Sequence, residues 1–262
     1  MFFLLFQSMK FCRLISNYIP IKMSSISNTF RLMPQDSIVL QQYVLEPCPL
    51  PKSIQLPLLQ EYIKQYMDPR LEFYKETQRS LYIEDEFSEW WTVKATKGIQ
   101  IGKGNEATDV ITSEKEGIDA MCVIMNNKES NEKSLIQNFN TAGCDLDNLF
   151  KNKDDTVAVQ LFMNDLKKKL LHVKEKYELI DLYILAFISL PDSVHISCFK
   201  YNLDKIDTVL SSGFTQRAQS IFINGFIEEK YGNVKLYKAK KRIELRLKKS
   251  CIVENPFSVK LY

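Results

Sequence analysis

The 262-residue sequence contains only two histidines, His172 and His195, and its six cysteines stand far apart without a Cys-x-x-Cys pair. Histidine-based metal centres and zinc sites need such residues clustered at short spacing, so both kinds of site are excluded. Cysteines in apolar runs, such as Cys122 and Cys198, are typical of small buried side chains in a reducing compartment. The cysteine pattern therefore predicts a cytoplasmic protein.

Long apolar runs are also absent. The opening hydrophobic stretch, residues 1–6, is too short to span a membrane, which argues against a membrane partner. Residues 1–33 contain four basic residues and no acidic one, a composition that fits either a transit peptide or codons upstream of a later start at Met9, Met23 or Met33. Under both interpretations we expect this extension to lie outside the fold, with residues 34–262 forming a single α/β domain.

Glycine is scarce, with eight residues in the chain, yet four of them fall between Gly98 and Gly117. Such local enrichment indicates tight backbone geometry at one place. The segment Gly102–Gly104 is not a phosphate-binding Walker loop, because the Gly-Lys-Ser/Thr that should follow is missing. We expect the rest of the fold to be arranged around this stretch.

Two apolar segments follow the glycine-rich loop, Thr108–Thr112 and Gly117–Met125, with the polar Ser113–Glu116 between them. β-Branched residues and a connection of hairpin length predict two strands joined by a short turn. Each strand has one aspartate near its start, Asp109 and Asp119, in otherwise apolar surroundings. Burying an ionised, unpaired carboxylate in a core lowers the stability of a protein by roughly several kcal/mol, so each aspartate needs a partner.

Two explanations for this pair of aspartates are open. In the first, each carboxylate accepts backbone hydrogen bonds at a turn and has a structural role. In the second, Asp109 and Asp119 hold a hard cation between two strands, which is the arrangement of a metal-dependent phosphodiesterase.

Hydrophobic periodicity outlines the remaining elements. Asp68 before Pro69 indicates the start of a helix. The tryptophan pair Trp90–Trp91 is expected to pack its helix against a sheet. An almost continuous apolar run predicts a central strand over 179–190, followed by an alternating strand over 194–201. Apolar residues at helical spacing predict further helices over 58–66, 84–92, 132–139 and 156–177.

The C-terminal region is basic, with nine lysines and arginines between Lys230 and Lys249 against the single acid Glu244. Apolar residues alternate with charged ones over 242–248, which predicts a strand with one buried and one charged face. One interpretation is an edge strand protected by its charges. We favour a surface that binds DNA phosphates. Its predicted contact residues are Lys238, Lys240, Lys241, Arg242 and Arg246.

The order of these elements is a helix ending in Trp-Trp, a glycine loop, a strand with Asp109, a turn, a strand with Asp119, a helix and the strand over 182–189. This order resembles the helix–three strands–helix–strand core of PD-(D/E)xK nucleases, and type II restriction endonucleases in particular. The phrases GNEATDV and EGIDAMCV are similar to their metal-binding strands, and the resemblance covers less than half of the chain. It implies a restriction-endonuclease-like mixed central sheet flanked by helices.

The resemblance also implies the chemistry. Asp109 and Asp119 match the two acids that hold Mg²⁺, and Glu89 matches an acid from the preceding helix. The implied function is hydrolysis of phosphodiester bonds in double-stranded DNA by a Mg²⁺-dependent site-specific endonuclease, and a homodimer is compatible with it. The motif departs at Met121, where these enzymes have lysine, and Lys103 and Lys133 are the candidate replacements.

The missing lysine leaves two alternatives to a nuclease open. The first is a DNA-binding or assembly subunit without catalytic activity, which is consistent with Met121. The second is a protein-interaction domain.

Overall fold

The computed structural model describes residues 43–77, 81–101, 106–126, 129–136, 145–190, 193–254 and 257–260. The chain divides into two units, Met1–Val39 and Leu40–Tyr262, and all of the described residues belong to the second. The expected extension over residues 1–33 and the glycine loop over 102–105 lie outside the described residues.

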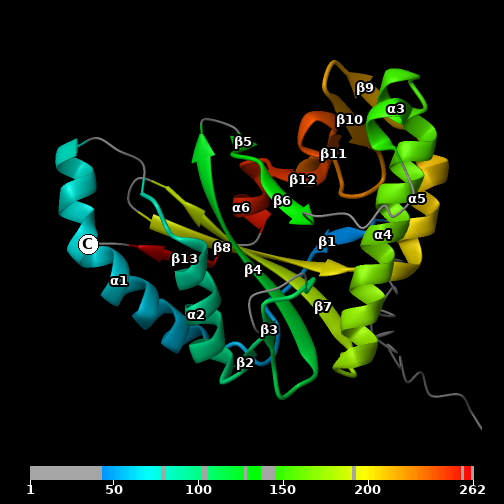
Figure 1. Ribbon diagram of the computed structural model, residues 1–262. Helices are drawn as coiled ribbons and strands as arrows, with labels where there is room; N and C mark the ends of the chain where they lie inside the picture. The colour runs from blue at the N-terminus through cyan, green and yellow to red at the C-terminus, as the bar shows by residue number, and fades with distance from the viewer. Residues whose placement is uncertain are drawn as a thin grey trace, which may run out of the picture. The chain divides into compact units, whose positions relative to one another are not determined.

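The described part is mixed α/β, with a mixed sheet flanked by helices (Figure 1). Strands β4 and β7 run parallel at the centre of the first sheet, and the other strands pair antiparallel. The order across the sheet is β1 (Leu45–Pro47), β8 (Ser193–Tyr201), β7 (Asp181–Ser189), β4 (Glu116–Asn126), β3 (Val110–Ile111) and β2 (Ile99–Gln100). Two short strands lie off this path, β13 (Phe257–Lys260) beside β8 and β5 (Glu129–Ser130) beside the end of β4. The predicted hairpin and the two strands near 179–201 are thus confirmed.

A second, antiparallel sheet follows the order β6 (Lys133–Ile136), β12 (Arg242–Leu247), β11 (Gly232–Tyr237), β10 (Ser220–Ile223) and β9 (Phe214–Arg217). The prediction of a helix over 132–139 is therefore wrong for residues 133–136. This segment pairs with β12 and buries Leu135, so sheet pairing outweighs the local helical spacing. Because β12 pairs with β6 on one side and β11 on the other, it is also not an edge strand.

The principal helices are α1 (Leu56–Thr77), α2 (Asp85–Thr96) and α4 (Asp155–Lys176), with shorter elements α3 (Leu146–Lys151), η1 (Leu203–Lys205), α5 (Ile206–Ser212), η2 (Lys238–Lys240) and α6 (Ser250–Glu254). The predicted helix start at Asp68 is wrong, since Pro69 lies inside α1. The buried face of α1 continues across the proline through Met67 and Leu71, and this burial offsets the lost backbone hydrogen bond. No helix in the described ranges is long and apolar enough to cross a membrane.

The first sheet is buried on both faces, as the alternation along β7 shows. Leu182, Ile184, Ala186 and Ile188 belong to a core shared with α4 and the second sheet. Tyr183, Leu185 and Phe187 belong to the opposite core, formed with α1 and α2. In that core Trp91 is fully buried with its ring 5.7 Å from the Phe187 ring, whereas Trp90 is 41% exposed. The expected packing of the tryptophan pair on the sheet is therefore confirmed for Trp91.

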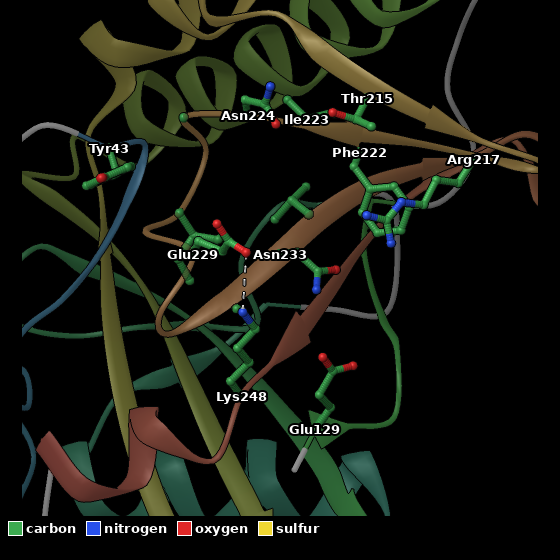
Figure 2. Close-up of a pocket in the computed structure, with 14 residues that line it drawn as sticks. Tyr43, Glu129, Thr215, Arg217, Phe222, Ile223, Asn224, Glu229, Asn233 and Lys248 are labelled. Carbon is green, nitrogen blue, oxygen red and sulfur yellow. Dashed lines mark ion pairs between the residues drawn. The ribbon is translucent and has the colours of Figure 1, made fainter.

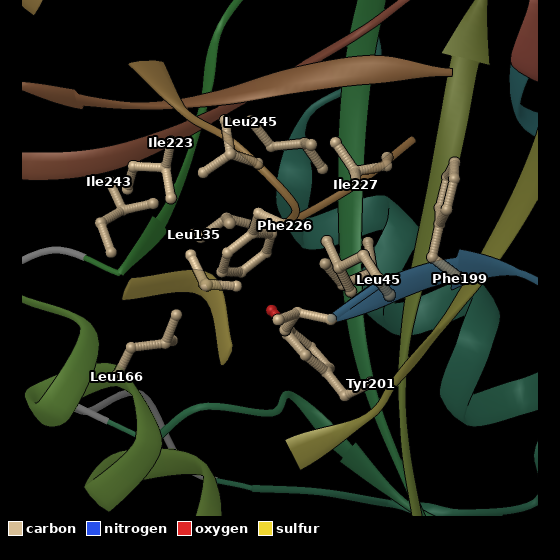
Figure 3. Packing of buried hydrophobic residues seen from close by; sticks show 14 of the residues in the cluster. Leu45, Leu135, Leu166, Phe199, Tyr201, Ile223, Phe226, Ile227, Ile243 and Leu245 are labelled. Carbon is tan, nitrogen blue, oxygen red and sulfur yellow. The ribbon is translucent and has the colours of Figure 1, made fainter. Parts of the chain in front are cut away.

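The two sheets share one hydrophobic core around Phe226, which is completely buried (Figure 3). Figure 3 shows Phe226 with Leu135 and Ile243 from the second sheet near it and Leu45 from β1 on the other side. The backbone carbonyl of Phe226 accepts a hydrogen bond from the Leu45 N–H at 2.8 Å. These contacts fix the second sheet against the first.

Tight backbone geometry is confirmed at two of the predicted glycines. A Cβ atom at Gly117 would lie 2.7 Å from a methyl carbon of Leu182, so a side chain does not fit between β4 and β7. A Cβ atom at Gly98 would lie 2.6 Å from the carbonyl oxygen of Ile111. Both glycines thus permit close packing beside the hairpin.

A buried ion pair joins the second sheet to α4. The Lys238 ammonium lies 2.7 Å from an Asp155 carboxylate oxygen, and both residues are buried. Lys238 is therefore not a surface group, in contrast to the DNA contact predicted for it. Asp155 is buried in the first turn of α4, where an unpaired carboxylate would be costly, and Lys238 supplies its cation.

Removal of either partner of this pair should destabilise the protein strongly. Lys238→Met or Asp155→Leu alone leaves one unpaired buried charge and should lower the free energy of unfolding by about 3–5 kcal/mol, measured by urea denaturation. The double variant should regain most of that loss. Lys241→Met, which breaks an exposed pair with Asp147, should cost less than about 1 kcal/mol. A double variant as unstable as the worse single variant would contradict this account.

Candidate active site

The middle of one edge of β4 has no neighbouring strand. β3 pairs with β4 at Gly117 and Ile118, and β5 pairs with its last two residues. Between these positions, in the described ranges, side chains take the place of a strand. The Asp109 carboxylate accepts a hydrogen bond from the Ala120 N–H at 2.9 Å, and the Asp85 carboxylate accepts one from the Cys122 N–H at 3.2 Å.

Each of these carboxylates is positioned by a local feature of the chain. Asp109 lies at the start of β3, where its backbone N–H donates to the Ile118 carbonyl at 3.0 Å. Asp85 is the first residue of α2, and Glu89 follows it by one helical turn on the same face. Asp119 belongs to β4 itself. Three elements therefore direct acids to the unpaired edge.

The acids line a cavity of about 340 Å³, which we call the acidic pocket. The sequence-predicted residues Glu89, Asp109, Asp119 and Lys133 all line it, as does Arg242, which was predicted to contact DNA. The structure thus brings together four of the five predicted catalytic or metal-binding residues. The fifth, Lys103, lies outside the described residues. The complete lining is Asp85, Glu89, Asp109, Asp119, Ala120, Met121, Glu132, Lys133, Ser134 and Arg242.

Lys133 reaches the acidic pocket from β6, and its ammonium lies 3.0 and 3.2 Å from the two carboxylate oxygens of Asp85. The predicted position on a helix is wrong, but the predicted proximity to the acids is found. Sequence analysis missed Asp85, although an acid at the start of a predicted helix, one turn before Glu89, was a usable signal. Met121 is buried and supplies no charge.

Burial raises the pKa of Asp119 well above its usual value, and the adjacent negative charge of Asp109 and a hydrogen bond between the two raise it further. Burial also raises the pKa of Asp109, although hydrogen bonds with Asp119 and the Ala120 N–H oppose this. The pair consequently retains a proton under conditions in which isolated aspartates are ionised. Burial and the charge of Asp109 raise the pKa of Glu89 as well.

The donor atoms of the acidic pocket suit a hard divalent cation. Carboxylate and carbonyl oxygens are the ligands that Mg²⁺ prefers, and the Ala120 carbonyl accepts a long hydrogen bond of 3.4 Å from the Ser88 hydroxyl. The hydroxyl oxygen of Ser134, which lines the same pocket, is buried without a partner among the described residues. Within those residues, no group of three or more His, Cys, Asp or Glu side chains is arranged to hold a metal by itself. Mg²⁺ typically uses one or two carboxylates and keeps several waters, so the Asp109–Asp119 pair fits this ion.

The wall of the acidic pocket that faces the aspartates is formed by charged side chains in and beside the second sheet. The Arg242 guanidinium lies 2.5 Å from the Glu244 carboxylate, which is buried. Glu132 accepts hydrogen bonds from Lys235, at 2.5 Å, and from Arg246. Burial alone would raise the pKa of Glu132, but hydrogen bonds with Glu244 and Lys235 and nearby positive charges lower it to about 2. Burial and the hydrogen bond with Glu132 raise the pKa of Glu244.

The predicted DNA-binding residues thus have different surroundings. Lys240 is exposed near the Tyr237 ring, and Lys241 is exposed beside Asp147 at 2.8 Å. Arg242 faces the acidic pocket. Arg246 is half-buried between Glu129 and Glu132. A continuous basic surface is therefore not formed by the five residues predicted for it, because acids distant in sequence pair with most of them.

No protein-family model, curated protein or solved structure matches the chain. Any functional conclusion consequently depends on the geometry and chemistry of the acidic pocket.

Neutralising Asp119 should stabilise the protein in a pH-dependent way. A carboxyl whose pKa is raised by folding contributes stability below its unfolded pKa of about 3.9, and this contribution is lost as pH rises through the folded pKa. Asp119→Asn should therefore raise the melting temperature by a few degrees at pH 7 and by much less at pH 4. Asp204→Asn, at an exposed aspartate, is the control and should change neither value. A lower melting temperature for Asp119→Asn at pH 7 would show that the ionised carboxylate is structural.

Proposed function

We propose that the protein is a Mg²⁺-dependent endonuclease that hydrolyses phosphodiester bonds in double-stranded DNA, with its catalytic centre in the acidic pocket. The observation that carries the proposal is the meeting of Asp109, Asp119 and Glu89 with Lys133 at the unpaired edge of β4. A pocket that combines clustered acids, raised carboxyl pKa values and nearby cations is typical of a catalytic site.

The order of the elements supports the same proposal. Helix α2 is followed by β2, β3 and β4, and after the crossover helix α4 the chain enters β7 parallel to β4. This is the helix–three strands–helix–strand order of the PD-(D/E)xK nucleases that the sequence resembles. The helix of that core corresponds to α4 instead of the segment expected over 132–139. A restriction-endonuclease-like fold is therefore part of the proposal.

Asp109, Asp119 and the Ala120 carbonyl are the groups that would hold Mg²⁺. When bound, this ion supplies neutralisation of phosphate charge and lowers the pKa of a coordinated water. The aspartate pair would release its proton to solvent as the ion binds, because ligating carboxylates must be ionised. The Ala120 N–H, which donates to Asp109, holds that carboxylate in place.

Lys133 takes the role of the lysine that Met121 replaces. Its ammonium can donate to a phosphate oxygen, and Asp85 positions it by accepting from it. Arg242 lines the same wall from β12, the strand paired with β6, and is held by Glu244, so a phosphate that faces this wall would meet two cations. In this arrangement the two cations bind and orient the DNA backbone, and the acids face the phosphate that reacts.

One observation favours a second candidate, a DNA-binding subunit without catalytic activity. Met121 supplies no cation, and the Lys133 ammonium is already paired with Asp85. If Asp85 retains Lys133 when DNA is bound, the acidic pocket lacks a free cation beside the aspartates.

Cleavage of plasmid DNA in the presence of Mg²⁺ tests the proposal. The wild-type protein should cleave, chelation with EDTA should abolish the activity, and Asp119→Ala should abolish it without loss of folding. Lys133→Ala should reduce the rate by about 10²–10³-fold, the usual effect of removing one group that stabilises developing charge in the transition state. Lys115→Ala removes a lysine from an exposed ion pair with Glu178 and should leave the rate unchanged.

Two further variants distinguish the alternatives. If Lys103→Ala is inactive and Lys133→Ala is active, Lys103 takes the role of the motif lysine. An inactive wild type that gains cleavage in Met121→Lys would identify a nuclease-like subunit without activity. If all forms are inactive and none binds DNA, the nuclease proposal is wrong.

Lys240 and Lys241 provide a separate test of DNA binding. Each is exposed, and the surface ion pair of Lys241 is weak enough to exchange for a phosphate. The Lys240→Gln/Lys241→Gln variant should bind duplex DNA more weakly, and the slope of log affinity against log salt should decrease by about 1.8, or 0.9 per contact. Lys75→Gln, on the exposed side of α1, is the control. An unchanged slope would show that these two lysines do not contact DNA phosphates and contribute only to solubility.

A further inference from the structure

A second cavity, of about 530 Å³, lies over the second sheet and has no role in the proposed catalytic centre. We call it the sheet pocket. Figure 2 shows Phe222 and Arg217 side by side at one end of it, with Asn224 above and Asn233 projecting into its middle. An aromatic ring, a guanidinium and two amides therefore surround one space.

The polar groups of these side chains have no acidic or hydrogen-bonding partner among the described residues, and Arg217 lies over the Phe222 ring. The guanidinium carbon of Arg217 lies 5.4 Å from the centre of the Phe222 ring, and no carboxylate within the described ranges pairs with it. The side-chain amides of Asn224 and Asn233 likewise make no hydrogen bond to any described residue. In contrast, Lys248 of the same pocket has an acidic partner, Glu229 at 3.8 Å, as the dashed line in Figure 2 marks. Arg217 is thus a cation of the sheet pocket without an acidic partner among the described residues.

This combination of groups matches the chemistry of a nucleotide. The half-buried face of Phe222 offers a stacking surface for a base, and such stacking is tolerant of base identity. The amides of Asn224 and Asn233 present donors and acceptors suited to a base edge. Arg217, beside the ring, is placed to hold a phosphate through two N–H groups.

The sheet pocket and the acidic pocket are connected along one face of the second sheet. Phe222 is opposite Lys235, Lys235 is opposite Glu244, and Glu244 is opposite Ser134. Ser134 lines the acidic pocket and Phe222 lines the sheet pocket. Three interstrand steps span about 14 Å, which corresponds to roughly four nucleotides at the spacing of one duplex strand.

A chain of ion pairs also connects the two pockets. Arg246 bonds both Glu129, which lines the sheet pocket, and Glu132, which lines the acidic pocket. This pairing fixes the segment between the pockets, so a bound strand would meet a rigid surface between them.

We propose that the sheet pocket binds a nucleotide that is out of the duplex, with its base on Phe222 and its phosphate on Arg217, as a unit of the nucleic-acid strand whose cleaved phosphate occupies the acidic pocket. This inference rests on the proposed nuclease function for its connection to the acidic pocket. A free nucleotide has the same chemistry, and the experiment below distinguishes the two sources.

The test uses full-length Asp119→Asn protein with EDTA, so that binding is measured without cleavage. Fluorescence anisotropy follows a labelled 12-nucleotide DNA strand and the corresponding duplex, and calorimetry follows 2′-deoxyadenosine 5′-monophosphate. Phe222→Leu and Arg217→Gln should each weaken binding of the DNA by about tenfold or more. Arg70→Gln is the matched control, because Arg70 also lies over an aromatic ring, that of Tyr66 at 3.7 Å, and does not line the sheet pocket.

The outcomes distinguish a DNA strand from a free nucleotide as the ligand. They also distinguish failure of the sheet-pocket proposal from failure of the nuclease proposal. Loss of DNA affinity with negligible binding of the mononucleotide supports a strand, and equal losses for both ligands support a free nucleotide. If Phe222→Leu and Arg217→Gln weaken binding although wild-type protein never cleaves, the sheet pocket stands and the nuclease proposal fails. If wild-type protein cleaves and both folded variants bind like Arg70→Gln, the inference about the sheet pocket is overturned.

Discussion

The unpaired edge of β4 is the constraint on which the rest of the site depends. The pairing of β3 with β4 ends at Ile118 of β4. Without other acceptors, the N–H groups of the following β4 residues would be buried and unpaired. Asp109 and Asp85 supply those acceptors. The structural explanation for an acid in this hairpin is thus valid for Asp109. It does not exclude the chemical one, because the carboxylate that accepts from Ala120 also lies beside Asp119, and burial together with the charge of Asp109 raises the pKa of Asp119.

The acidic pocket is assembled from parts of the chain that meet only in the folded protein. Asp85, Glu89, Asp109 and Asp119 come from α2 and the hairpin of the first sheet. Lys133, Ser134 and Arg242 come from the second sheet, and Glu132 immediately precedes it. The core around Phe226 fixes the two sheets against each other. Because both walls of the pocket require this packing, correct docking of the second sheet is a condition for placing cations opposite the acids.

Sequence patterns predicted what depends on local order. β-Branched residues and a short polar connection identified the hairpin, and the apolar run over 179–190 has the position of β7. The two aspartates of the hairpin indicated a common site, and the resemblance added Glu89. Patterns failed where distant residues decide the structure. Segment 133–136 has helical spacing but pairs with β12, and the apolar face of α1 continues through Pro69. The basic C-terminal stretch appeared continuous, whereas Asp155, Glu129 and Glu132 neutralise much of it from afar.

We propose that Asp109 and Asp119 share a proton and exchange it for a divalent cation. Calorimetric titration of Mg²⁺ into the wild-type protein, repeated in buffers with different ionisation enthalpies, measures the protons released on binding. Because ligating carboxylates must be deprotonated, we expect the wild-type protein to release protons on binding Mg²⁺, and fewer of them as the pH rises. The Asp109→Asn/Asp119→Asn variant should lose both Mg²⁺ binding and proton release. Unchanged Mg²⁺ binding by that double variant, or binding without proton release near neutral pH, would contradict this proposal.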